Sequence, residues 1–225
     1  MKNLTAKSFV GLAQLLLIVA VLLFLPAWTF HYWQAWIFLL VFGISVFVIT
    51  LYFLRVDPRL IESRLKAGPA AEQQRSQKII QALASIFFIL PFMISSLDHR
   101  FRWSNVPLYL VILGDILVAL GLLFVFFVFR ENTFTSATIE LRDEQRVISS
   151  GPYALVRHPM YAGAFLMLLG IPLALGSWWA FIPVFLLFAA IIWRLIEEEK
   201  FLAKNLSGYA SYRQKVRYRL IPFVW

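Results

Sequence analysis

Long apolar runs dominate the chain, and short polar segments separate them. Six runs approach or exceed the roughly 20 residues that an α-helix needs to cross the hydrocarbon core of a bilayer. They cover residues 8–28, 35–54, 79–97, 106–129, 161–175 and 178–196. The pattern therefore predicts an all-α, polytopic membrane protein with about six transmembrane helices.

The fifth run is the shortest, and it contains Gly163, Gly170 and Pro172. Because these residues weaken or bend a helix, we expect this span to start in the membrane interface or to be kinked. Gly176 and Ser177 then predict a tight turn into the sixth run.

The first run follows Lys2 and Lys7, as the apolar part of a signal peptide would. The run is long, however, and Pro26-Ala27-Trp28 is a poor match to the small-residue pattern of a cleavage site. We therefore expect the first run to be a retained span.

Composition narrows the possible chemistry. Hydrophobic residues make up 61% of the chain and charged residues 15%, whereas soluble domains carry about a quarter charged residues. The chain has no cysteine, which excludes disulfides, thiolate nucleophiles and cysteine-bound metals. The three histidines, His31, His99 and His158, are scattered, so no metal site is predicted.

Positive charge predicts the orientation. Lysine and arginine gather in segments 55–78 and 130–160 and in the tail, whereas the other side has Arg100 and Arg102. The positive-inside rule then places both termini in the cytoplasm, in a plasma or inner membrane or in the endoplasmic reticulum of a eukaryote. The net charge of +9 suits an anionic bilayer surface better than nucleic acid. Six tryptophans are expected at the opposite interface: Trp28, Trp33, Trp36, Trp103, Trp178 and Trp179.

Polarity is distributed unevenly, which suggests two parts. Residues 1–129 form a predicted bundle of four spans, and residues 130–225 combine mixed residues, a helical hairpin and a charged tail. We expect the chemistry on the cytoplasmic side of the second part. The sequence carries no signal for the oligomeric state.

Residues 151–163 concentrate helix breakers, aromatic rings and charge between apolar runs. Pro159 favours the first turn of a helix and biases His158 away from helical geometry, so the fifth span should begin at His158. The free N–H groups at that end attract anions. The segment is either a binding site or a membrane entry with Arg157 at the lipid phosphates and Tyr161 in the interface.

Arg194 and Glu198 are four residues apart and share a helix face at the cytoplasmic end of the last span. Charge at this depth is costly unless it is paired or functional. The two residues are therefore either an ordinary ion pair or part of a site.

Asp115 lies within the fourth span. It is either a functional carboxylate or a structural residue that forms a hydrogen bond inside the bundle.

Together these motifs resemble those of the isoprenylcysteine carboxyl methyltransferase family. The family pattern G-x-Y-x-x-x-R-H-P-x-Y-x-G matches residues 151–163. The pattern R-x-x-x-E-E-x-x-L matches residues 194–202. A glycine followed four residues later by a tyrosine, Gly208 and Tyr212, and a basic, proline-ended tail match the family over residues 208–222. The resemblance covers about the last eighty residues.

The resemblance implies an S-adenosylmethionine (SAM)-dependent carboxyl methyltransferase whose cofactor lies at the cytoplasmic face. It implies that Arg194 and Glu198 are catalytic, with Arg194 facing the substrate carboxylate and Glu198 also binding the cofactor. The other implied cofactor contacts are Val147, Ile148, Tyr153, Arg157, His158, Pro159, Met160 and Tyr161. Many relatives have a histidine eight residues before the motif tyrosine, where this chain has Gln145.

The implied partners are the bilayer and a lipidated or lipophilic carboxylate, such as a prenylcysteine. A carboxylate attacking a sulfonium methyl group needs alignment and removal of water rather than a covalent intermediate. Three alternatives stay open: a phospholipid amine N-methyltransferase, an NADPH-dependent membrane sterol-type reductase, and a membrane protein without enzymatic activity. Arg157, His158 and Arg194 favour a carboxylate acceptor over an amine. The acidic run 197–199 argues weakly against the phosphate of NADPH.

Overall fold

The computed structural model describes residues 2–65, 70, 72, 75–134 and 146–225. Its long helices are α1 (Lys2–Ala27), α2 (Trp33–Val56), α4 (Arg75–Phe101), α5 (Leu108–Glu131), α6 (Pro159–Ala174) and α7 (Phe181–Asn205). Shorter elements are α3 (Pro58–Leu65), the 3₁₀ turn η2 (Gly151–Ala154) and α8 (Tyr209–Lys215). The described residues contain no strand, so the all-α prediction is confirmed.

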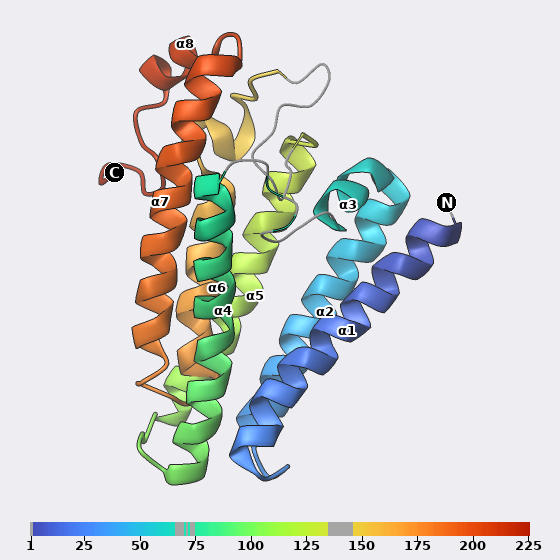
Figure 1. Ribbon diagram of the computed structural model, residues 1–225, viewed down its shortest axis with the longest axis vertical. Helices are drawn as coiled ribbons and strands as arrows, with labels where there is room; N and C mark the ends of the chain where they lie inside the picture. The colour runs from blue at the N-terminus through green and yellow to red at the C-terminus, as the bar shows by residue number, and fades with distance from the viewer. Residues whose placement is uncertain (1, 66–69, 71, 73–74, 135–145) are drawn as a thin grey trace.

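The six long helices alternate in direction, and the two termini lie toward the same end of the bundle (Figure 1). Each apolar run of the sequence falls largely within one of these helices. By length and composition, α1, α2, α4 and α5 qualify as membrane-crossing helices among the described residues. Helix α6 has 16 residues and is a shorter apolar helix, so four candidate spans are found and six are not confirmed.

Two elements differ from the sequence prediction. Helix α7 continues nine residues beyond position 196 to Asn205. This last part includes Glu197, Glu198 and Lys200 and therefore lies outside the apolar run. Helix α3 lies within the basic segment 55–78, where no helix was predicted. The side chain of Asp57 accepts the N–H of Leu60 at 3.2 Å and caps this helix, a polar signal that apolar periodicity does not detect.

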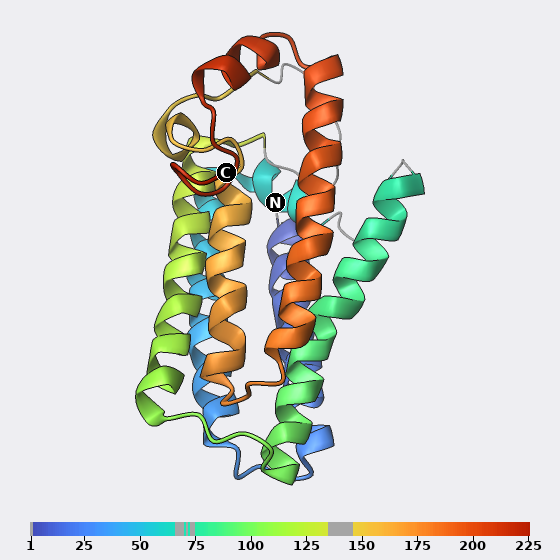
Figure 2. The ribbon, with the colours of Figure 1, turned by 90° about the vertical axis from the view of Figure 1, so that its left-hand side faces the viewer.

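Helices α5 and α6 lie side by side along their length (Figure 2) because glycines line the contact between them. A Cβ atom added to Gly114 would lie 2.2 Å from the backbone nitrogen of Ala174. A Cβ on Gly121 would lie 2.5 Å from the nitrogen of Met167, and Gly163 and Gly170 face α5 in the same way. Small residues at such spacing let two membrane helices approach closely. Gly163 and Gly170 thus pack α6 closely against α5.

Replacing Gly121 with alanine should therefore separate these helices and lower the stability of the bundle by about 1–3 kcal/mol. The matched control is Gly11→Ala in α1, where the added Cβ would make an ordinary 3.8 Å contact with Leu65. Thermal unfolding of the two variants in detergent measures the difference. Equal melting temperatures for both variants would contradict a tight α5–α6 contact.

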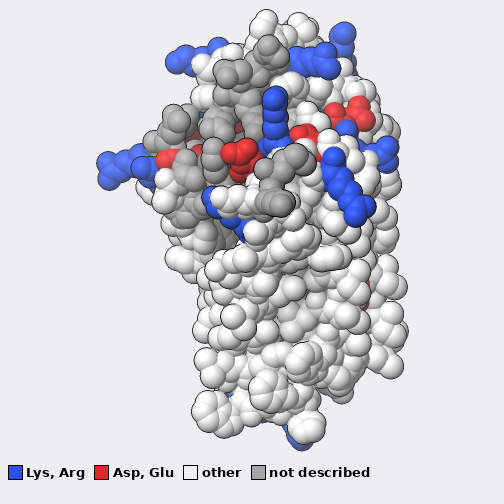
Figure 3. Space-filling view, turned by 90° about the vertical axis from the view of Figure 1, so that its right-hand side faces the viewer, with Lys and Arg blue, Asp and Glu red and all other residues white. Residues whose placement is uncertain are grey.

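Charge gathers at the end of the bundle that carries the termini, and the body is largely uncharged (Figure 3). Tryptophans mark the opposite end, where Trp28, Trp33, Trp103 and Trp178 lie at or beside the interhelical connections and are exposed. The turn between α6 and α7 is formed as predicted, with Gly176 at φ +72°. This distribution matches the expected polar and aromatic ends of a membrane bundle.

Candidate active site

The first motif forms the start of α6. His158 caps the helix with φ −124° and ψ 60°, and Pro159 is the first helical residue, as predicted. The N–H groups of Arg157 and His158 donate to the carbonyls of Tyr218 and Arg219, each at 2.9 Å. The C-terminal tail therefore folds back and pairs with the segment that leads into α6.

A buried ion cluster fixes this arrangement. Glu199 on α7 accepts the Nε of Arg157 at 2.6 Å and the Nε of Arg219 at 2.9 Å, and Nε2 of His158 lies 3.3 Å from it. Arg157 also donates to the carbonyls of Val216 and Arg217, both at 2.8 Å. Arg157 is thus buried in the protein and does not project toward lipid phosphates, which removes the membrane-entry interpretation of its side chain.

The charge of Glu199 is set by this cluster. Burial alone would raise the pKa of its carboxyl group, but hydrogen bonds from His158, Arg157 and Arg219 outweigh burial and hold the pKa well below its usual range. The group is therefore an anion that ties α7 to α6 and to the tail. Its role is to position the neighbouring motif residues.

A second polar cluster is formed by other side chains of α6 and α7. The hydroxyl of Tyr161 donates to Oε2 of Glu198 at 2.7 Å. Arg194 forms an ion pair with Oε1 of Glu72 at 2.8 Å and donates to Oε1 of Gln77 at 3.1 Å. The Arg194 and Glu198 side chains thus contact partners on other helices and connections, which is more than the ordinary pair within one helix.

Arg64 of α3 completes this second cluster. Its guanidinium donates to the sulfur of Met160 at 3.1 Å and lies over the ring of Phe129, 4.7 Å from the centroid. Burial lowers the pKa of Arg64, although the neighbouring tyrosines oppose this. Arg64 therefore places a second, half-buried cation beside the motif residues of α6.

The remaining predicted cofactor contacts lie around these clusters. Tyr153 is buried in η2, its carbonyl accepts the hydroxyl of Tyr212 at 2.7 Å, and burial raises the pKa of its phenol. Val147 packs against the apolar faces of Tyr209, Tyr212 and Val216, and Ile148 is half-buried beside it. Gln145 lies outside the described residues.

The structure thus brings together at one end of the bundle all the predicted site residues. Three contacts come from the first part of the chain and were not predicted: Arg64, Glu72 and Gln77. An acidic residue within a segment rich in lysine and arginine was the available signal for Glu72.

Asp115 lies near the opposite end of α5 and is not part of either cluster. Its Oδ1 atom is buried without a hydrogen-bond partner among the described residues.

Comparison with known proteins agrees with the motifs. Residues 109–208 match the phospholipid methyltransferase family. A stretch of 76 residues is 37% identical to the protein-S-isoprenylcysteine O-methyltransferase of Schizosaccharomyces pombe, covering 31% of this chain and 30% of the relative. A stretch of 128 residues is 29% identical to a probable protein-S-isoprenylcysteine O-methyltransferase of Oryza sativa subsp. indica, covering 54% and 62%.

Over part of its length, the chain is similar to isoprenylcysteine carboxyl methyltransferases. The resemblance that the motifs at 151–163 and 194–202 predict is therefore confirmed. The chain spans between about a third and three-fifths of the length of these relatives. The isoprenylcysteine methyltransferase motifs coincide with the two polar clusters, which makes this end of the bundle the candidate active site.

Proposed function

We propose that this chain is an integral-membrane, SAM-dependent carboxyl methyltransferase that forms a methyl ester on a prenylcysteine-like or other lipid-linked carboxylate. One observation carries the acceptor class: Arg194 already holds a buried carboxylate, that of Glu72, beside Tyr161 and Glu198. Gln77 adds a buried amide nitrogen that has no hydrogen-bond partner among the described residues. Two donors of this kind suit an anionic oxygen better than an amine.

The chemistry of the motif residues fits SAM. Aromatic rings of Tyr153 and Tyr161 and the carboxylate of Glu198 favour a sulfonium cation. The helix start at His158 and Pro159 favours the carboxylate of a methionine group. SAM supplies an electrophilic methyl group when it is bound. Val147, Ile148, Arg157 and Met160 complete the proposed contacts, Arg157 by holding the adjoining tail in place.

The chain's own contribution to the reaction is alignment and exclusion of water. Arg194 would orient the acceptor carboxylate, which is already ionised at neutral pH and needs no general base. Burial of Arg194, Leu195 and Tyr161 keeps bulk water away from this position and strengthens the interaction with an anion. A lipid-linked acceptor would enter sideways between the helices from the bilayer. Both termini would face the cytoplasm, since the basic segments lie at their end of the bundle.

Glu72 must leave Arg194 before a substrate carboxylate can bind there. Replacing Glu72 with glutamine should therefore lower the KM for the lipid-linked carboxylate about fivefold to tenfold with little change in kcat. Glu62→Gln, an exposed change on α3, is the matched control. Initial rates against acceptor concentration measure the effect. A KM that rises in Glu72→Gln would show that Glu72 assists acceptor binding and does not compete with it.

A second candidate, phospholipid amine N-methylation, is favoured by the family match over residues 109–208. The carboxylates of Glu72 and Glu198 could face a cationic amine instead of the sulfonium group. Supplying phosphatidylethanolamine with radiolabelled SAM separates the two candidates, because an N-methyl product is stable to alkali and a methyl ester is not. Alkali-stable label in this phospholipid would favour the amine acceptor.

A further inference from the structure

A polar pocket lies at the end of the bundle opposite the motif clusters. It has a volume of about 430 Å³, within the range of small-molecule sites. Three connections form it: the link between α1 and α2, the link between α4 and α5, and the start of the turn after α6. The proposed methyl transfer does not use this pocket, and the pocket lies at the aromatic end of the molecule.

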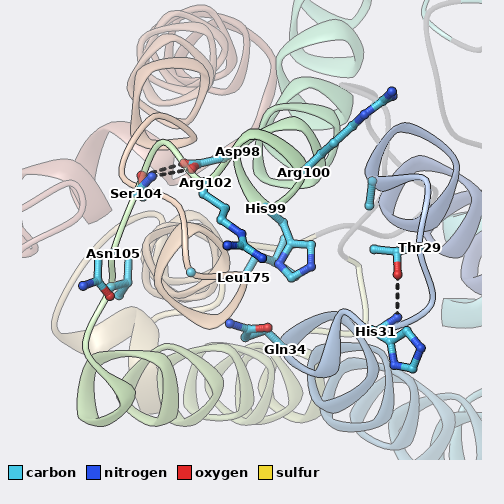
Figure 4. A pocket seen from close by; sticks show the side chains of 13 residues that line it. Thr29, His31, Gln34, Asp98, His99, Arg100, Arg102, Ser104, Asn105 and Leu175 are labelled. Carbon is cyan, nitrogen blue, oxygen red and sulfur yellow. Dashed lines mark hydrogen bonds between the residues drawn. The ribbon is translucent and has the colours of Figure 1, made fainter.

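The pocket is cationic. Arg102 and His99 point toward one another at its centre, Gln34 lies across from them, and Arg100 and His31 lie at its edge (Figure 4). Asp98 is the one carboxylate that the described residues contribute to its lining, and hydrogen bonds to two serines occupy the oxygens of Asp98. It accepts the N–H of Ser104 at 2.7 Å, the hydroxyl of Ser104 at 2.6 Å and the hydroxyl of Ser177 at 2.5 Å.

Neighbouring residues fix the positions of His99 and Gln34 in the pocket. The ring of His99 stacks on buried Tyr32 with the centroids 4.0 Å apart. Tyr32 in turn donates to the carbonyl of Leu175 at 2.6 Å. Gly176 adjoins Gln34, since a Cβ there would lie 3.4 Å from its Nε2. The pocket is therefore built by the fold and is not a chance gathering of surface cations.

Gln34 adds a specific requirement. Its Oε1 atom is buried and has no hydrogen-bond partner among the described residues, and a buried acceptor of this kind needs a donor. A ligand that satisfies the pocket therefore carries both an anion for Arg102 and His99 and a hydroxyl for Gln34. A phosphodiester with an alcohol headgroup has both, and arginine is well suited to phosphate.

We propose that this pocket binds a phosphate-bearing group with a hydroxyl substituent, of the kind presented by a glycerophospholipid headgroup. Exposed Trp28, Trp103 and Trp178 flank the pocket, and tryptophan is typical of the headgroup level of a bilayer. Lipid headgroups therefore reach the pocket directly. The site is separate from the proposed methyl transfer and does not depend on it.

The test is thermal unfolding of the full chain in a neutral maltoside detergent. Phosphatidylglycerol, phosphatidylcholine with the same acyl chains, glycerol 1-phosphate and inorganic phosphate are titrated separately. Phosphatidylglycerol should raise Tm saturably. The half-saturating concentration should rise about tenfold in Arg102→Gln and in His99→Gln, because each removes one charge-assisted or ring N–H contact to phosphate.

Arg102→Lys should retain most of the effect, and Arg75→Gln at the other end should match the wild type. If glycerol 1-phosphate saturates at the same concentration as phosphatidylglycerol, the headgroup alone is the ligand and the proposal stands. An equal response to phosphatidylcholine, or an unchanged half-saturation in Arg102→Gln and His99→Gln, would overturn it.

Discussion

Replacing Arg157 with alanine is expected to destabilise the protein by about 3–5 kcal/mol, because the change leaves the buried carboxylate of Glu199 without its shortest ion pair. It also removes two hydrogen bonds to the carbonyls of Val216 and Arg217, which hold the tail against α6. Thermal unfolding in detergent should show a large fall in Tm. Arg213→Ala, an exposed change on α8, is the matched control and should stay near the wild type.

A double-mutant cycle separates the ion pair from the tail contacts. Because Arg157 and Glu199 stabilise each other, the loss in Arg157→Ala/Glu199→Ala should be clearly smaller than the sum of the single losses. Strict additivity would show that the pair is not coupled. The tail contacts would then account for the whole effect of Arg157.

The same cluster predicts a pH dependence. Since the folded state lowers the pKa of Glu199 below its ordinary value of 4.5, the group contributes stability above that pH. The contribution is lost as the pH falls through the folded pKa. The stability difference between the wild type and Glu199→Gln should therefore stay constant above about pH 5.5 and shrink in more acidic solution. A difference that grows on acidification would contradict this sign.

Replacing Arg194 with alanine is expected to lower kcat/KM for a lipid-linked carboxylate about a hundredfold to a thousandfold, the loss typical of a positioned charged donor at a reacting group. The dissociation constant of SAM should change little. Arg194→Lys should restore little activity, because lysine lacks the planar pair of donors that orients a carboxylate. Lys200→Ala on the same helix, where the side chain is exposed, is the control for folding.

Glu198→Ala should behave differently from Arg194→Ala. It removes the partner of Tyr161 and the carboxylate proposed to face the sulfonium group, so both SAM affinity and turnover should fall. Equilibrium binding of SAM, measured beside the rate, separates these roles. Full activity in both variants would show that the reaction takes place elsewhere.

The sequence alone predicted the parts of the fold that follow a simple residue pattern. Six apolar runs predicted six helices, and Pro159 predicted the start of α6 because proline fixes the geometry of a first turn. The spacing of Arg194 and Glu198 predicted a shared helix face. Which helices can cross a bilayer was less predictable, because α6 is short and α7 becomes charged in its second half.

The partners of the motif residues could not be predicted in the same way. Glu72 is far from Arg194 along the chain, and only the packing of α4 against α7 brings the two together. The role of Glu199 was also hidden, because an acidic run at a helix end usually faces water. Burial among Arg157, His158 and Arg219 makes it a structural anion instead.

The most direct test supplies radiolabelled SAM to membranes that contain this protein, with and without a farnesylcysteine analogue, and treats the labelled lipid with alkali. Volatile labelled methanol that depends on the analogue, and that is lost in Arg194→Ala, is the result expected for a carboxyl methyltransferase. Label that survives alkali, or no label above the Arg194→Ala/Glu198→Ala double variant, would contradict the proposed reaction.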